Sequence, residues 1–168
     1  MTSDDDRPDV AEQLARQVAE LAQSGGRTVA VAESLTGGTI STRLSAAPSS
    51  ATWFRGGVVA YAADVKFQVL DVPPGPVVTA SCAAAMASGV ARLLGADAAV
   101  AVTGVGGPDD EEGEPPGTVF LAAVLSGVPI RSERHRFVGE PDDVVTATTE
   151  RALGMLVEAL QHSPPAPS

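Results

Sequence analysis

Basic side chains, cysteine and aromatic residues are all scarce in this chain of 168 residues, and each scarcity excludes a class of protein. Eleven lysines and arginines against twenty-one acidic residues give a net charge of −10. So acidic a chain offers no basic surface to nucleic acid or to an anionic membrane. The single cysteine, Cys82, excludes an internal disulfide and any multi-cysteine zinc or iron–sulfur site.

Long apolar runs are missing too. No stretch reaches the ~20 residues of a membrane-spanning helix, and the acidic first residues do not resemble a signal peptide, so we expect a cytoplasmic protein. Hydrophobic residues make up 44% of the chain and aromatic ones only 4%. This composition favours a core of alanine, valine and leucine between closely packed layers, in which Cys82 is expected to be a small buried residue.

Strand-like and helix-like segments alternate along the chain. Short apolar runs predict strands at residues 28–31, 54–61, 98–102, 118–125 and 130–137, the last two joined by a hairpin at 126–129. Amphipathic or alanine-rich runs predict helices from about Pro8 to residue 25, at 39–44 and 62–70, from Thr79 or Ser81 to Leu94, and from Pro141 to about Gln161. The order predicts an α/β fold, a three-layer α/β/α sandwich with a mixed sheet. We expect one domain over residues 8–161, with flexible tails at 1–7 and 162–168.

The segment 32–38 (AESLTGG) carries the clearest chemical signal. Ser34 follows a buried strand and precedes a helix, where backbone N–H groups and the helix dipole favour an oxyanion or a phosphate. Ser34 could therefore be a nucleophile. The alternative is that Ser34 or Thr36 only caps the helix.

A lysine could serve such a serine as a base. Lys66 interrupts an otherwise apolar segment, and a lysine drawn toward a half-buried site loses solvation, which lowers its pKa. Ser–Lys pairs need no histidine. Neither histidine suits a triad, since His162 borders the tail and His135 lies on a strand that looks solvent-facing. The alternative is that Lys66 is solvated and that the nearby Tyr61 is a packing residue.

A glycine-rich loop at 103–108 (TGVGGP) follows another buried strand. It matches neither familiar nucleotide fingerprint, because it lacks a Gly-Lys-Thr ending and its glycines do not open a helix. The acidic run 109–112 that follows is expected to be a solvated loop rather than a magnesium site. Alone, the loop indicates a tight backbone path more than a ligand.

Four segments together resemble the CinA C-terminal domain family, the nicotinamide-nucleotide amidohydrolases. They are 32–38 (AESLTGG), 53–61 (WFRGGVVAY), 96–104 (ADAAVAVTG) and 117–119 (GTV), and the resemblance extends over roughly residues 8–161. It implies an α/β/α fold with a mixed sheet. It also implies hydrolysis of the carboxamide of nicotinamide mononucleotide to nicotinate mononucleotide and ammonia, with no metal and no cofactor.

The same resemblance implies roles for individual residues. Ser34 would be the nucleophile, with Lys66 and Tyr61 as its proton-handling partners. The implied substrate-binding residues are Glu33, Thr36, Gly37, Gly38, Thr103, Gly104, Gly106, Gly107 and Thr118. The implied partner is a small pyridine nucleotide, and the chain could form a homo-oligomer.

The chain also departs from the family's pattern. Members often carry Tyr-Ser-Asn where this chain has 61–63 (YAA), and arginines where it has Pro141 and Val145. Losing both arginines removes the groups best suited to bidentate phosphate binding. The arginines that could replace them are Arg55, Arg131, Arg134 and Arg136. Two alternatives stay open: a weakly active or inactive nucleotide-binding or regulatory module, and a Ser–Lys hydrolase of another amide.

Overall fold

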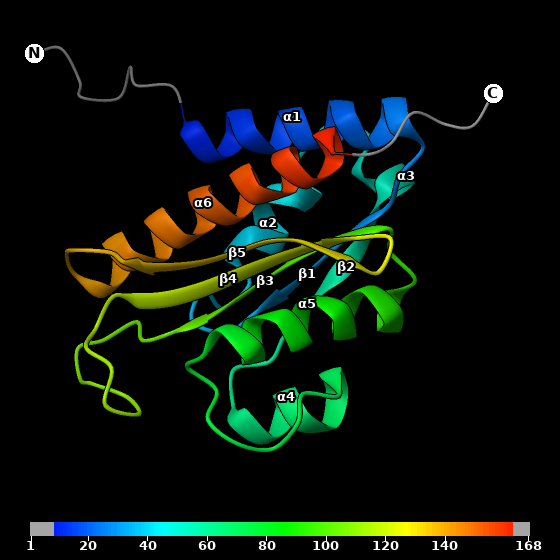
Figure 1. Cartoon of the computed structure of the whole chain (residues 1–168). Helices are drawn as coiled ribbons and strands as arrows, with labels where there is room; N and C mark the ends of the chain where they lie inside the picture. Colours follow the sequence, from blue (N-terminus) through cyan, green and yellow to red (C-terminus); the bar gives the residue numbers. More distant parts are fainter. Residues whose placement is uncertain (1–8, 163–168) are drawn as a thin grey trace, which may run out of the picture.

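A five-stranded mixed sheet forms the centre of the protein, shown by a computed structural model that describes residues 9–162 (Figure 1). The strands are β1 (Val29–Glu33), β2 (Phe54–Val59), β3 (Ala98–Gly104), β4 (Thr118–Leu125) and β5 (Val128–Arg136). Their order is β2-β1-β3-β4-β5, with β1 parallel to β2 and β3, and with β4 antiparallel to both of its neighbours. The mixed sheet that the sequence predicts is therefore confirmed.

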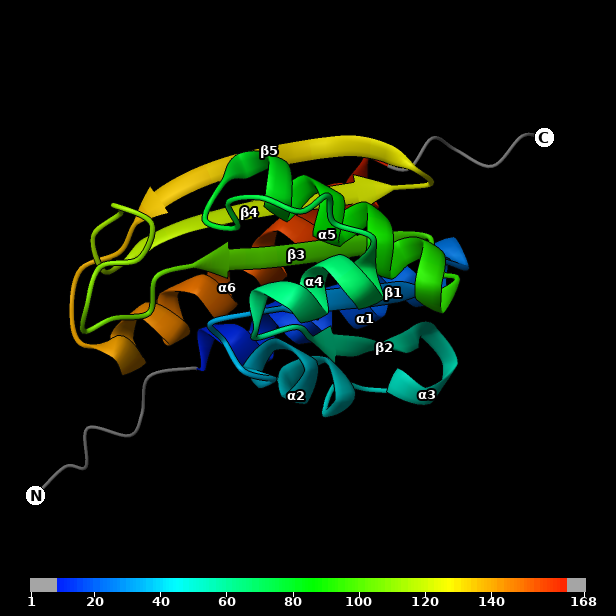
Figure 2. The same ribbon diagram turned by 90° about the horizontal axis from the view of Figure 1, so that it is seen from below.

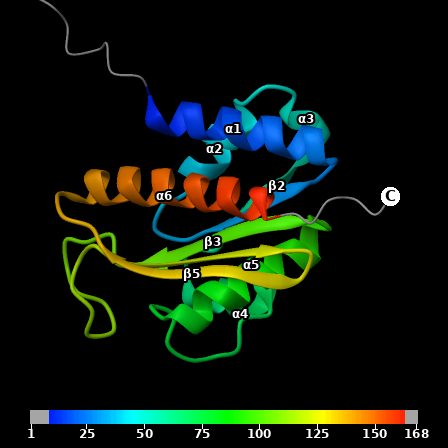
Figure 3. The same cartoon turned by 45° about the horizontal axis from the view of Figure 1, so that its top comes forward.

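Helices cover both faces of this sheet. One face carries α1 (Val10–Gly25), α2 (Thr39–Ser45), α3 (Ser50–Trp53) and α6 (Pro141–Gln161); the other carries α4 (Ala63–Leu70) and α5 (Ala80–Leu94). In Figure 1, α1 and α6 lie above the sheet and α5 below it, and Figure 3 shows α1 and α6 running side by side. Figure 2, seen from below, shows α4 and α5 together on the opposite face. These three layers confirm the predicted sandwich.

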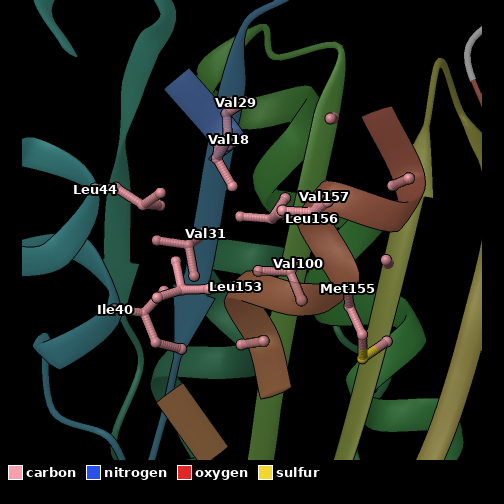
Figure 4. Packing of buried hydrophobic residues seen from close by; sticks show 14 of the residues in the cluster. Val18, Val29, Val31, Ile40, Leu44, Val100, Leu153, Met155, Leu156 and Val157 are labelled. Carbon is pink, nitrogen blue, oxygen red and sulfur yellow. The ribbon is translucent and has the colours of Figure 1, made fainter. Parts of the chain in front are cut away.

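The central strands present different side chains to the two layers. In β1, Val29 and Val31 pack with the α1/α6 layer, while Ala30 and Ala32 pack with α5. Figure 4 shows the valine side, with Val31 and Val100 beside Leu153 of α6. Because alanine is small, the other face accepts a closely packed, alanine-rich α5.

Most helix ends follow local sequence signals. Thr79 caps α5, its hydroxyl accepting the Cys82 N–H at 3.1 Å, and Gly95 ends the helix in the left-handed region at φ 64°. α6 begins at Pro141 as predicted, behind a capping box formed by Glu140 and Asp143. Pro8, where the first helix was expected to start, lies outside the described residues, and α1 begins at Val10.

Several predicted strand boundaries are wrong; the first strand, for example, runs to Glu33 rather than ending at residue 31. β2 ends at Val59 rather than at residue 61, and β3 continues through Thr103 to Gly104, which the sequence placed in a loop. The hairpin turn is only Ser126 and Gly127, at φ 51° and 77°. Two left-handed residues match the twist of the flanking strands, so pairing resumes at once and β5 starts at Val128 rather than at 130.

A bulge and a close contact with α2 lie next to each other in β2, at residues 55–57. The register of β2 against β1 shifts between Phe54 and Gly56, which is a bulge at Arg55. A Cβ on Gly57 would lie 2.0 Å from Ser41 Oγ, so only glycine lets α2 approach β2 this closely.

Candidate functional site

The predicted site residues meet at one edge of the sheet. Ser34 directly follows β1, Ala60 and Tyr61 follow β2, and Gly104 is the last residue of β3. The three strands are parallel to one another, so their carboxyl ends lie at the same edge, where open α/β sheets bind ligands. Tertiary structure thus gathers residues that the sequence spreads over 70 positions.

Lys66 and Ser34 form a buried pair. Lys66 Nζ lies 3.0 Å from Ser34 Oγ, and the side chains are 1% and 7% exposed. The same Nζ donates to the carbonyl oxygens of Ala60 at 2.7 Å and Tyr61 at 3.1 Å. Lys66 is the only lysine of the chain, which otherwise uses arginine at its ten basic positions. This bias is a sequence signal that could have marked Lys66 as a functional residue. The expectation of a half-buried lysine understates its burial.

Close helix packing holds Lys66 in place. It lies on α4, which contacts α5 at Gly89, where a Cβ would lie 2.0 Å from the carbonyl oxygen of Leu70. The missing side chain lets the two helices touch, and α4 then directs Lys66 inward to the ends of β1 and β2.

Burial lowers the pKa of Lys66, because the charged ammonium loses its hydration. Negative charge on Cys82, when that thiol is ionised, and on Glu111 and Glu112 acts in the opposite direction. Burial raises the pKa of the Cys82 thiol, so at neutral pH the two carboxylates account for this effect. In its neutral form the amine has two N–H groups and one lone pair. With both N–H groups on the two carbonyls, the lone pair faces Ser34 and can accept its hydroxyl proton.

Glu33, and neither Ser34 nor Thr36, caps α2. Its carboxylate is fully buried and accepts hydrogen bonds from five groups. The donors are Thr36 Oγ1, the N–H groups of Gly38, Ile40 and Ser41, and Ser41 Oγ, at 2.7–3.2 Å. The alternative that Ser34 or Thr36 caps the helix is therefore wrong, and a substrate contact by Glu33 or Thr36 stays a prediction. Ser34 is left free to face Lys66.

The backbone after Ser34 leaves one pocket-facing N–H unpaired. The Gly37 N–H donates to the Ser34 carbonyl at 3.1 Å, and the Gly38 N–H to Glu33. By contrast, the Leu35 N–H donates to no acceptor among residues 9–162, nor do those of Gly106 and Gly107. All three residues line the pocket described next. These three N–H groups are candidate donors to an oxyanion. From the sequence alone, such donors were expected among residues 35–38.

A pocket of about 160 Å³ opens beside Ser34. Its lining comprises Ser34, Leu35, Tyr61, Gly104, Gly106, Gly107, Glu111, Pro141 and Val145. The Tyr61 side chain is 71% exposed, so it forms an outer wall. Thr103 and Thr118 are buried outside this lining, their hydroxyls donating to the carbonyls of Val77 and Pro115. A substrate contact by these two threonines stays a prediction.

The pocket is poor in positive charge. Within the part of the chain that the structure describes, no arginine or histidine lines it, and its one acidic lining residue is Glu111. Arg55 donates to the Leu94 carbonyl near the start of β2, Arg131 pairs with Glu133, and Arg134 with Glu114 at 3.2 Å. Arg136 is on β5, away from the lining. None replaces the arginines absent at positions 141 and 145.

Other features of the described residues are weaker candidates for a functional site. A larger cavity of about 350 Å³ lies between α1 and α2, where Arg16 pairs with Glu12 and Arg43 with Asp9, but the cavity holds no nucleophile–base pair. No three His, Cys, Asp or Glu side chains among residues 9–162 converge as a metal site would need. Over the same residues, no helix has the length and apolar character to cross a membrane.

Known proteins are similar to this chain in sequence and in fold. The profile described as "CinA C-terminal domain" matches residues 11–160. The chain belongs to the CinA C-terminal domain family. A CinA-like protein of Geobacter sulfurreducens is 41% identical over 146 residues, covering 83% of this chain and 35% of that protein. The chain thus spans little more than a third of the length of the curated relatives it matches.

Solved CinA structures superpose over most of the chain. The competence damage-inducible protein A of Klebsiella pneumoniae MGH 78578 has a TM-score of 0.87 at 34% identity, covering 92% of this chain and 99% of that one. The competence/damage-inducible protein CihA of Agrobacterium tumefaciens gives 0.86 at 31% identity, covering 92% and 98%. The CinA C-terminal fold therefore accounts for nearly all of the described chain.

Proposed function

We propose that the chain is an amidohydrolase that deamidates nicotinamide mononucleotide to nicotinate mononucleotide and ammonia. The observation that carries the proposal is the buried Ser34–Lys66 pair, 3.0 Å apart at the wall of a pocket. Membership of the CinA family supports the same substrate class. The reaction needs only the pyridine nucleotide and water as partners, and we expect it to take place in the cytoplasm.

In the proposed first half-reaction, Ser34 Oγ attacks the carboxamide carbon while the neutral Lys66 amine takes the hydroxyl proton. The tetrahedral oxyanion receives hydrogen bonds from the free N–H groups of Leu35 and the glycine loop. Each such donor contributes about 3 kcal/mol in comparable enzymes. Lys66 returns its proton to the leaving nitrogen, the C–N bond breaks, and ammonia leaves an acyl-enzyme.

In the second half-reaction, water replaces ammonia. Lys66 takes a proton from the attacking water, the ester bond to Ser34 breaks, and Lys66 gives the proton to Ser34 Oγ as the carboxylic acid leaves. In this scheme the Tyr61 carbonyl orients the amine, and its exposed ring forms a wall for the substrate. A proton-handling role for the Tyr61 ring stays a prediction.

An ammonia-release assay tests the proposal. Purified protein is incubated with nicotinamide mononucleotide, nicotinamide riboside or nicotinamide, and ammonia is measured by a coupled reaction while mass spectrometry follows conversion of amide to acid. We expect ammonia and acid in equal amounts. Absence of both from all three compounds would overturn the proposal.

A second candidate is a nucleotide-binding or regulatory module without turnover, and the lack of basic lining residues favours it. Such a module would bind one of these compounds with measurable heat yet release no ammonia. A third candidate, a Ser–Lys hydrolase of another amide, would hydrolyse a generic acyl amide in a Ser34-dependent way and leave the nicotinamides intact.

A further inference from the structure

The lining of the pocket beside Ser34 contains an acidic side chain where a phosphate-binding site would contain basic ones. Glu111, Pro141 and Val145 share this lining. Pro141 and Val145 lie in the first two turns of α6, and Glu111 lies in the long loop between β3 and β4. A phosphate held by this wall would meet a carboxylate and two apolar side chains.

The loop that carries Glu111 is held just after it. The Glu112 carboxylate accepts the N–H groups of Val77 and Val78, with shortest distances of 2.6 and 2.9 Å. Two residues further along, the Glu114 carboxylate pairs with Arg134 at 3.2 Å. Backbone bonds between Glu111 and Glu114, at 3.1 and 2.8 Å, close the turn. The Glu111 side chain is exposed, as the sequence suggested for this acidic run, and it also lines the pocket.

The charge of Glu111 reaches the reactive pair. Burial lowers the pKa of Lys66, and the Glu111 carboxylate opposes this shift by favouring the charged ammonium. A substrate in the pocket experiences the same negative charge. It attracts a pyridinium ring and repels a phosphate dianion, most strongly at low ionic strength.

We infer that Glu111 determines specificity, so that the site prefers a phosphate-free pyridinium carboxamide, such as nicotinamide riboside, over the phosphorylated nucleotide. This inference rests on the proposed amidase function. Nicotinamide riboside is a cation, nicotinamide is neutral, and nicotinamide mononucleotide carries a phosphate whose second pKa is about 6. The three compounds share one reacting carboxamide and differ in charge.

The test compares kcat/KM for the riboside and the mononucleotide in three proteins: wild type, E111Q and D110N. Asp110 is exposed in the same loop but does not line the pocket, so D110N removes one charge as a matched control. We expect the wild type to favour the riboside. E111Q should shift the ratio toward the mononucleotide by about three- to tenfold, and D110N by less than about twofold. In 0.5 M salt the wild-type preference should shrink toward that of E111Q.

A wild type that prefers the mononucleotide, or a ratio that E111Q and D110N change equally, would overturn the inference while leaving the amidase function intact. If no compound releases ammonia, the amidase function fails, and calorimetric binding to the Ser34→Ala protein decides the inference. Tighter binding of the riboside than of the mononucleotide would support it. Tighter binding of the mononucleotide, or no binding of either, would reject it.

Discussion

The two sides of the pocket are built in different ways. Ser34 and Lys66 are buried, lie at or against the ends of central strands, and hydrogen-bond to each other. The facing wall consists of an exposed loop residue, Glu111, and two half-buried residues at the start of α6. A change on the first side acts on the reacting atoms, whereas a change on the second alters only what the pocket contacts. The reactive side is therefore constrained by the fold, and the facing wall can vary with the substrate.

The largest expected effect is on the reactive side. Ser34→Ala should reduce amide hydrolysis by roughly 10³-fold or more, because it removes the attacking oxygen. Stability should change little, since Glu33 rather than Ser34 caps α2. Ammonia release and the thermal midpoint check both, with Ser24→Ala, on the exposed end of α1, as control. Wild-type turnover in a folded Ser34→Ala protein would remove Ser34 from the mechanism.

Lys66→Met should reduce turnover by about 10²–10⁴-fold, since it keeps the apolar stem and deletes the base. It should also change the pH dependence of stability. In the wild type, the pKa of Lys66 is lower in the folded than in the unfolded chain. Between those two pKa values the unfolded chain holds a proton that the folded chain lacks, so the free energy of unfolding rises with pH, by at most about 1.4 kcal/mol per pH unit.

The Lys66→Met protein should lack this rise, which urea unfolding at several pH values would reveal. Because the chain contains one lysine, ¹³Cε-lysine labelling gives a single side-chain NMR signal that reports its pKa directly. A midpoint at or above the ordinary 10.5 would contradict the desolvation argument.

Glu33→Gln tests whether the reactive side depends on its support. In glutamine an NH₂ group replaces one carboxylate oxygen, so it would face backbone N–H groups that need an acceptor. We therefore expect a loss of about 2–4 kcal/mol in the free energy of unfolding. Glu20→Gln, exposed on α1, should lose less than about 0.5 kcal/mol. Equal losses of unfolding free energy in the two variants would show that the buried Glu33 cap stabilises the protein no more than an exposed glutamate does.

Val145→Arg tests the facing wall. An arginine here can offer a phosphate a charge-assisted bidentate contact, so the preference for the mononucleotide over the riboside should rise about tenfold. Val138→Arg adds the same charge at a residue that is almost fully exposed and does not line the pocket. If Val138→Arg raises the preference for the mononucleotide as much as Val145→Arg does, the effect comes from net charge and not from the pocket lining.

The smallest expected effect is that of a chelator. The proposed chemistry uses Ser34 and Lys66 alone, so EDTA should leave the rate of ammonia release unchanged. Loss of activity in EDTA, restored by a divalent ion, would assign a metal role to the acidic residues 109–112.

Local sequence signals were sufficient for much of the fold. Apolar periodicity located all five strands, Thr79 and Gly95 marked the ends of α5, and Pro141 marked the start of α6. These predictions succeed because each depends on a residue's own backbone preference or on neighbours within one turn. The same reasoning placed Ser34 at a strand-to-helix junction, where the structure also has it.

Contacts between distant residues were decided only by tertiary structure. The burial of Lys66 requires α4 to pack against α5 at Gly89, and its partners lie at the ends of two different strands. The capping of α2 by Glu33 and the placing of Glu111 at the pocket depend on bonds that no local pattern encodes. The sequence by itself determined the elements and the candidate nucleophile, since those follow from short-range preferences. The contact of Ser34 with its base, Lys66, and the presence of Glu111 in the pocket lining required the assembled sheet and its two helical layers.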